Sequence, residues 1–96
     1  MNIQHEEDAV QGSFYIEDED GERVAEMTYA RDSATHWTID HTGVVEQLQH
    51  QGVAKRLVLA AVERARQEGV RITPLCPYAK AVFDRSPELN DVLDAT

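Results

Sequence analysis

The sequence predicts a small α+β domain in which an antiparallel meander of strands is followed by a strand-helix-strand unit and C-terminal helices. Three observations predict this class. Apolar residues recur with a period of two in the first half of the chain, as on half-buried strands. After Gly52 the period becomes that of a helix. A chain of 96 residues holds one modest core, so we expect residues 1–96 to form a single domain.

The first half of the chain predicts three strands. Residues 11–17 and 23–30 alternate apolar and polar side chains, and the segment EDEDGE between them holds a hairpin turn signal at Asp20 and Gly21. Residues 35–45 form the third strand, and two sets of side chains alternate along it. One set is Trp37, Ile39 and His41, and the other is Thr38, Asp40 and Thr42. Residues 1–10 are acidic and lack such a pattern, so we expect a loosely ordered N-terminus.

The second half of the chain predicts helices around one more strand. A helix follows Gly52 and stops near Gly69. Residues 70–73 form a short strand, which must return parallel to the strand before the helix. Pro77 then begins a helix that runs to about residue 84. Ser86 and Pro87 repeat this start signal for a short last helix.

Composition limits the partners and the compartment. The net charge is −9, which argues against nucleic-acid binding and suits a cationic partner, although simple solubility explains it as well. The single cysteine, Cys76, forms no intrachain disulfide, so we expect a reducing, cytoplasmic location. No apolar run is long enough for a membrane span or a secretion signal. His36, His41 and His50 are too scattered around one cysteine to predict a metal site.

The segment QLQHQGVAKR places Gly52 where a loop becomes the longest apolar helix. One interpretation is that Gly52 only lets the chain turn. The other is that it exposes backbone N–H groups at a helix N-terminus, where an anion such as a pyrophosphate can bind. The usual nucleotide-binding glycine motifs are absent, and spacing alone leaves both interpretations open.

Three residues are candidates for chemistry. Cys76 precedes Pro77 and is therefore the expected N-cap of a helix, where the helix dipole stabilises a thiolate; a lone cysteine is more often a small buried hydrophobe. His41 is the best candidate for a general base, although a structural hydrogen bond is the commoner role for a strand histidine. Tyr78 could protonate a leaving thiolate, or it could simply pack.

Three ordered motifs carry a resemblance to a known family. The loop QHQGVA resembles the Q/R-x-x-G-x-G/A loop of the GNAT superfamily of N-acetyltransferases. The succession of HTGVVEQLQHQGVAKRLVLAAVERAR, PLCPY and SPEL resembles the small, single-domain GNAT-like proteins of the YjdJ type over residues 12–94. This resemblance implies a shortened GNAT core that lacks the helices covering the acceptor site in larger members.

The resemblance also implies roles for individual residues. Val44 and Val45 would lie on the strand whose backbone pairs with the pantetheine arm of acetyl-CoA. Lys55 or Arg56 could meet the cofactor's phosphates, although two basic residues in a first helical turn are commonly solvated. Gly43 stands where the family commonly has a glutamate, which weakens any carboxylate base here. The residues that would hold the pyrophosphate are Gln49, His50, Gln51, Gly52, Val53 and Ala54.

We therefore expect an acetyl-CoA-binding protein that transfers acetyl to a primary amine. The charge favours a cationic acceptor such as a polyamine, a small amine or a lysine-rich peptide. Cys76 could carry the acetyl group, or the amine could attack acetyl-CoA directly. The alternatives are a CoA- or acyl-CoA-binding module, or a partner-binding module, with little turnover, and a small structural domain without a ligand. The oligomeric state is left open.

Overall fold

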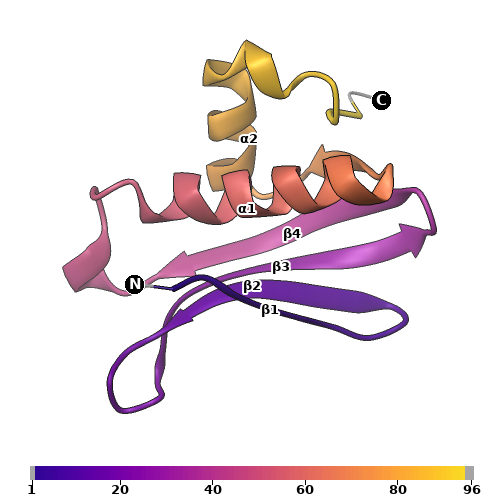
Figure 1. Cartoon of the computed structure of the whole chain (residues 1–96). Coiled ribbons are helices and arrows are strands. Elements are labelled where there is room, and N and C mark those ends of the chain that lie inside the picture. The colour runs from indigo at the N-terminus through magenta and orange to yellow at the C-terminus, as the bar shows by residue number, and fades with distance from the viewer. Residues whose placement is uncertain (1, 95–96) are drawn as a thin grey trace.

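The structure, a computed structural model, describes residues 2–94 and consists of one sheet covered on one face by helices (Figure 1). The strands lie side by side in chain order. They are β1 (Gln4–Glu7), β2 (Gln11–Glu17), β3 (Arg23–Ser33), β4 (His36–Val44) and β5 (Arg71–Pro74). The helices are α1 (Val53–Glu68) and α2 (Pro77–Arg85), and two short 3₁₀ turns are η1 (Glu46–Leu48) and η2 (Pro87–Leu89).

The sheet combines an antiparallel meander with one parallel pair. Strands β1 to β4 pair antiparallel with their neighbours, and β5 pairs parallel with β4 after the α1 crossover. The predicted α+β class, the meander and the strand-helix-strand unit are therefore confirmed. The expected short last helix is the 3₁₀ turn η2.

Helix α1 covers the sheet because its apolar residues recur on one side. Val53, Leu57, Val58, Ala61 and Val62 are buried, and they pack with inward side chains of the strands. Glycines bound the helix at both ends, because Gly52 and Gly69 both have a left-handed backbone, with φ of 76° and 69°. The opposite face of the sheet has no helix over it in the described part of the chain (Figure 1).

The N-terminal segment is more ordered than expected. Residues 4–7 form the edge strand β1, which pairs with β2 through Gln4–Tyr15 to Glu7–Gly12. The expectation of a loosely ordered N-terminus is wrong for these residues, and the reason is tertiary. A polar QHEE segment carries no strand pattern of its own, but it pairs with the open edge of β2. It also adds a half-buried ring, since the ring centroids of His5 and Phe14 are stacked 4.2 Å apart.

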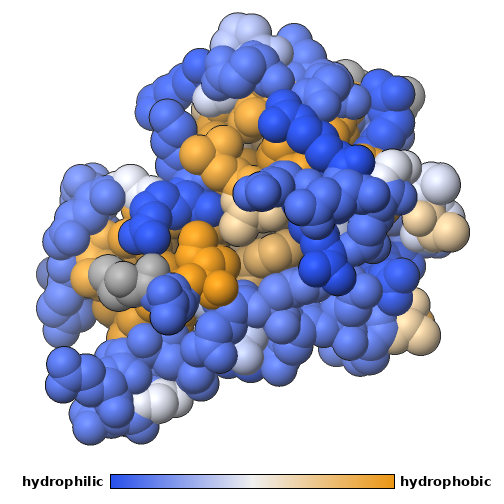
Figure 2. Space-filling view, viewed as in Figure 1, coloured by the Kyte–Doolittle hydropathy of each residue, from blue (hydrophilic) through white to orange (hydrophobic). Residues whose placement is uncertain are grey.

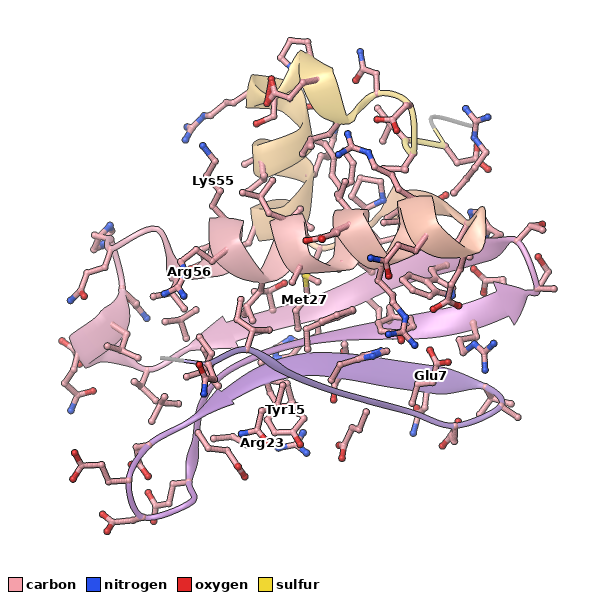
Figure 3. All side chains as sticks on the ribbon, in the orientation of Figure 1. Glu7, Tyr15, Arg23, Met27, Lys55 and Arg56 are labelled. Atoms are coloured by element: carbon pink, nitrogen blue, oxygen red, sulfur yellow. The ribbon has the colours of Figure 1, made fainter. Side chains whose placement is uncertain are left out.

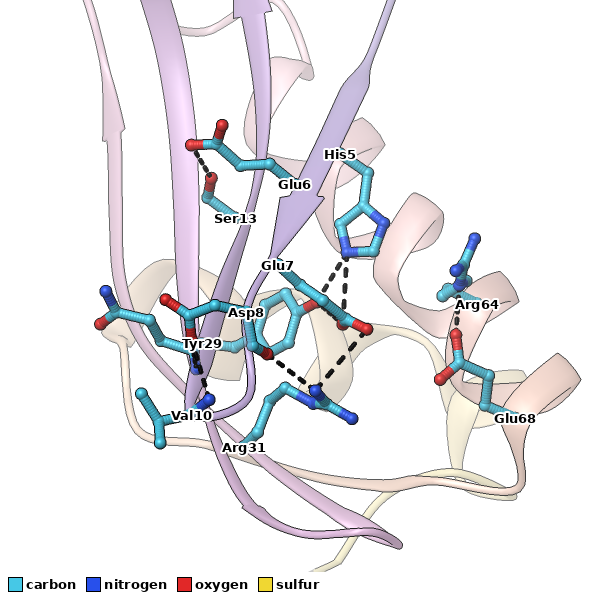
Figure 4. A network of polar contacts seen from close by, with 11 residues as sticks. His5, Glu6, Glu7, Asp8, Val10, Ser13, Tyr29, Arg31, Arg64 and Glu68 are labelled. Carbon is cyan, nitrogen blue, oxygen red and sulfur yellow. Dashed lines mark hydrogen bonds and ion pairs between the residues drawn. The ribbon is translucent and has the colours of Figure 1, made fainter.

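A network of polar contacts links β1 and the residue after it to β3 (Figure 4). The Tyr29 hydroxyl donates to Glu7 Oε2 at 2.7 Å, and His5 Nε2 lies 2.6 Å from the same hydroxyl oxygen. Gly12 makes room for this contact, because a Cβ there would lie 2.4 Å from the Tyr29 hydroxyl. Burial, followed by the hydrogen bond to Glu7, raises the pKa of Tyr29, so this hydroxyl stays protonated and donates at neutral pH.

This network predicts a loss of stability in mild acid. Desolvation, the largest cause, and the Arg64 guanidinium lower the pKa of His5 from 6.5, although Glu7 opposes them. Below pH 6.5 the unfolded chain therefore binds a proton that the folded chain does not, so the free energy of unfolding falls until the pH reaches the lowered folded pKa.

We expect wild type to lose more stability than His5→Gln between pH 7.5 and 5.5 in denaturant titrations. Acidic groups elsewhere are shared by both proteins, so the difference between the two pH profiles isolates His5. Parallel profiles would show that His5 does not contribute to the acid sensitivity.

Strand β4 contains a β-bulge that the simple alternation did not predict. His41 faces Thr28 and Ile39 faces Tyr29, so Asp40 is an extra residue in β4. Beyond the bulge the two faces exchange residues. His41 is exposed and Thr42 is buried, which reverses the predicted sides of these two residues.

Candidate functional site

The candidate site begins where β4 and β5 separate. Their pairing runs from His36–Arg71 to Ile39–Pro74, after which the Ile39 carbonyl accepts the N–H groups of Leu75 and Cys76 at 3.0 and 3.1 Å. The chain then leaves the sheet into α2, while β4 continues to Val44. The last part of β4 therefore has an edge that β5 does not cover. A crevice outside strand ends of this kind is where α/β sheets bind ligands.

Backbone groups of β4 point toward this edge. The Val45 N–H donates to the Val24 carbonyl on β3 at 2.9 Å, and successive residues of a strand direct their backbone groups to opposite sides. The groups of Val44 and Thr42 therefore point to the edge left by β5. The Gln49 side chain already uses one of them, since its Nε2 donates to the Val44 carbonyl at 3.0 Å.

Val45 differs from the prediction in its position. It lies past the end of β4 as the N-cap of η1, and its N–H faces β3 rather than the uncovered edge. Of the two valines, only Val44 has the backbone direction that pairing with an extended ligand at this edge requires.

The loop before α1 has an unusual backbone. His50 and Gly52 both have positive φ, at 64° and 76°, and His50 is the one non-glycine residue with positive φ among residues 2–94. Gly52 is the N-cap of α1, and no side chain caps the helix. Its carbonyl accepts the Arg56 N–H at 3.1 Å, so the N–H groups of Val53, Ala54 and Lys55 have no partner within the helix.

Space and charge around this helix start fit an anion. A Cβ built on Gly52 would meet no atom within 4 Å, so the backbone is open to an approaching group. Lys55 and Arg56 are exposed in the first turn, and Figure 3 shows Lys55 projecting away from the sheet. Gln51 is held in the loop, because its Nε2 donates to the Gln47 carbonyl at 2.9 Å. Figure 2 shows apolar surface over α1 and α2, bordered by hydrophilic residues.

Cys76 is the N-cap of α2, directly before Pro77, which is the position that the sequence predicts. The residue is only 5% exposed and belongs to the hydrophobic core with Ile39 and Leu57. A reactive thiol is expected to be partly exposed. In the structure, the Cys76 side chain is instead as buried as a packing residue. Its N–H bond to Ile39 nevertheless places it beside the point where the two strands separate.

The other two candidates for chemistry, His41 and Tyr78, are not grouped with Cys76 where β4 and β5 separate. His41 is exposed on the face of the sheet without helices, with its ring over Gly43, because a Cβ there would lie 3.3 Å from His41 Nε2. Together with Glu26 these two residues line a surface cavity of ≈ 330 Å³. Tyr78 is 59% exposed on α2 and does not pack in the core. The structure therefore does not gather Cys76, His41 and Tyr78 into one cluster.

Sequence reasoning missed Thr42. Its hydroxyl is buried and has no hydrogen-bond partner. Only the bulge turns this side chain inward, and no residue type in HTGV announces a bulge by itself.

No group of three or more His, Cys, Asp or Glu residues within 2–94 is arranged to hold a metal ion. No helix in the described part of the chain is long and apolar enough to cross a membrane.

Comparison with known proteins gives one family and a set of similar structures. A profile described as GCN5-related N-acetyl-transferase matches residues 13–92. The solution structure of a GCN5-like protein from Staphylococcus aureus, assigned as an N-acetyltransferase, is 35% identical with a TM-score of 0.78. That match covers 99% of this chain and 89% of the other. No protein with curated annotation matches.

Larger acetyltransferases share part of the fold. An acetyltransferase from Bacillus cereus is 25% identical with a TM-score of 0.58, and the match covers 71% of this chain but 46% of that one. The aminoglycoside acetyltransferase AAC(6')-Iy, solved with a CoA-containing bisubstrate analogue, is 18% identical with a TM-score of 0.56. That match covers 85% of this chain and 62% of the other, and at this identity it supports the fold alone.

Proposed function

Because the chain belongs to the GCN5-related N-acetyltransferase family, we propose that it binds acetyl-CoA and transfers the acetyl group to a primary amine. The observation that carries this proposal is the geometry where β4 leads into α1. An uncovered strand edge runs there into a left-handed glycine at an uncapped helix N-terminus. We also propose that the chain is one small domain of the YjdJ type.

The loop supplies the contacts for the pyrophosphate. The N–H groups at the start of α1 and the helix dipole favour an anion, and Gly52 allows the closest approach. Residues 49–54 form this cradle through their backbone, so the polar side chains of Gln49, His50 and Gln51 are not required as ligands. Lys55 adds a positive charge within the first turn, where it attracts the phosphates from solvent.

The uncovered edge of β4 supplies the contacts for the pantetheine arm. That arm carries amide groups along an extended chain, and the edge offers backbone groups of Thr42 and Val44. The Gln49 side chain must leave the Val44 carbonyl for that group to accept a bond from the arm. The acetyl end of the arm then reaches the region beside Cys76 and the bulge.

The acceptor approaches from the face of the sheet without helices. The cavity beside His41 opens on this face, and its lining includes Glu26 together with Arg23, whose guanidinium pairs with the Glu26 carboxylate. A cationic amine is attracted there by the net charge of −9 and must lose a proton before it attacks. His41 is the nearest candidate base for that proton.

Two routes conserve the acetyl group. In direct transfer the amine nitrogen forms a bond to the acetyl carbon, the C–S bond of the thioester breaks, and CoA leaves as a thiolate that takes a proton. In the covalent route the Cys76 thiolate first forms a bond to the acetyl carbon and CoA leaves as a thiolate that takes a proton. The amine nitrogen then bonds to the same carbon, and the Cys76 sulfur leaves as a thiolate. Tyr78 is a candidate proton donor to the departing thiolate in either route.

One observation favours a second function. Cys76 is buried and does not meet His41 or Tyr78 in one cluster, which favours a module that binds CoA or acyl-CoA with little turnover. Such a module would bind the cofactor through the same loop.

The release of free CoA thiol from acetyl-CoA, followed with a panel of amines, tests the proposal. We expect thiol release that depends on the amine and is fastest with polyamines or lysine-rich peptides. Neutral hydroxyl compounds of similar size serve as controls. Binding of CoA with no amine-dependent release would identify the binding module, and absence of binding would remove both functions.

A further inference from the structure

Thr42 has a buried hydroxyl that nothing in the protein satisfies. The residue is only 5% exposed, and Oγ1 has no hydrogen-bond partner. Among buried side-chain polar atoms of residues 2–94, Nε of Arg31 shares this state, but the same guanidinium donates through Nη1 to the Asp8 carbonyl at 2.7 Å. The Thr42 side chain has no second polar atom whose hydrogen bond could compensate for the unsatisfied hydroxyl.

The position of Thr42 connects it with the candidate site. It lies beyond the last β4–β5 pair, Ile39–Pro74, and therefore on the uncovered part of β4. Its side chain faces the helices, because it is directly opposite Met27, which is completely buried in the core. The N–H of the core residue Cys76 bonds to the carbonyl of Ile39, the last covered residue of β4, at the point where the uncovered stretch with Thr42 begins.

The choice of threonine at this position needs a reason. A hydroxyl removed from water without a partner destabilises the folded protein, whereas valine has nearly the same shape and carries no such cost. Strand geometry favours valine as much as threonine. A buried threonine without a partner beside an uncovered edge therefore indicates that the partner arrives with a ligand.

We infer that Thr42 is a cofactor-binding residue whose hydroxyl donates a hydrogen bond to a carbonyl oxygen of the acyl-pantetheine arm. The inference rests on the proposed function. Backbone groups at a strand edge repeat along the strand and do not by themselves fix how far an extended chain slides. One hydroxyl aimed at one carbonyl fixes that position, and thereby the place of the thioester relative to Cys76 and the bulge. The accepting oxygen is either an amide carbonyl of pantetheine or the thioester carbonyl.

The test compares Thr42→Val and Thr42→Ser with wild type in two measurements. The first is the melting temperature without ligand, and the second is the affinity for CoA and for acetyl-CoA by calorimetry. We expect Thr42→Val to melt at or above the wild-type temperature, because it removes the unsatisfied hydroxyl. We expect it to bind acetyl-CoA about fivefold to tenfold more weakly, the effect of one hydrogen bond. Thr42→Ser keeps the hydroxyl and should bind nearly as wild type does.

Thr38→Val is the matched control on the same strand. The Thr38 hydroxyl donates to Asp32 Oδ2 at 2.6 Å, so this change should lower the melting temperature and leave both affinities unchanged. Weaker binding of both ligands by Thr42→Val would identify a pantetheine amide, and weaker binding of acetyl-CoA alone would identify the thioester carbonyl.

Two results would overturn the inference and leave the proposed function standing. One is a Thr42→Val protein that binds both ligands as tightly as wild type. The other is a Thr42→Val protein that is less stable than wild type or does not fold, because the hydroxyl would then have a partner within the protein. A wild-type protein that binds neither ligand would overturn the proposed function and the inference together.

Discussion

Gly52→Val is expected to abolish most of the stabilisation that CoA gives to the folded protein. For wild type, CoA at 100 times its dissociation constant should add about 2.7 kcal/mol to the free energy of unfolding. A valine side chain at Gly52 would occupy the open space above the helix start, where nothing else lies within 4 Å, and would hold the pyrophosphate away from the N–H groups. The measurement is the thermal shift with CoA for both proteins.

Backbone strain must be separated from loss of the site, and the chain offers a matched control. Gly69 caps the other end of α1 with nearly the same backbone, φ 69° against 76°, and open space around it. A valine at either position must adopt a left-handed conformation, which costs roughly 1–2 kcal/mol. Gly69→Val should therefore melt lower to a similar extent but keep the full CoA shift. If Gly52→Val also kept the full CoA shift, the start of α1 would not be the anion site.

The course of β4 shows what a sequence pattern can and cannot predict. Alternation located the strand, because Trp37 and Ile39 are both core residues, as the period of two requires. It failed after Ile39, because Asp40 is an extra residue and reverses every later side chain. A bulge depends on how the neighbouring strand is paired, so the sequence of β4 alone does not determine it. The reversal turns His41 outward and Thr42 into the core.

The ends of α1 and α2 were predictable for a local reason. Gly52 and Gly69 adopt backbone conformations that other residues rarely tolerate, and Pro77 has the fixed φ of a first helical residue. Strand β1 was not predictable in this way, because His5 is ordered through Phe14 and Tyr29, which belong to other strands. Local chemistry therefore predicted the loop and caps of the candidate site, whereas contacts between strands decided which side chains face it.

Cys76→Ser is the second variant with a large expected effect, and it decides between the two routes of transfer. If Cys76 carries the acetyl group, amine-dependent thiol release should fall by about 100-fold or more, because the chemical step loses its nucleophile. CoA should still produce its thermal shift, since the loop is intact. Acetyl-CoA alone should add one acetyl group to Cys76 of the wild type, as seen by mass spectrometry of the peptides.

Because Cys76 is buried, the reactivity of its thiol must be measured together with the activity of the variant. A side chain that is 5% exposed reacts only when the region between β4 and α2 opens. The covalent route requires this region to open without global unfolding, so in that case iodoacetamide should modify the free protein faster than it unfolds globally, and bound CoA should protect the thiol. A thiol that reacts only on unfolding, together with full activity of Cys76→Ser, would show that the amine attacks acetyl-CoA directly. Cys76 would then be a residue of the same core cluster as Ile39 and Leu57, and only groups of β4 would be available to polarise the thioester carbonyl.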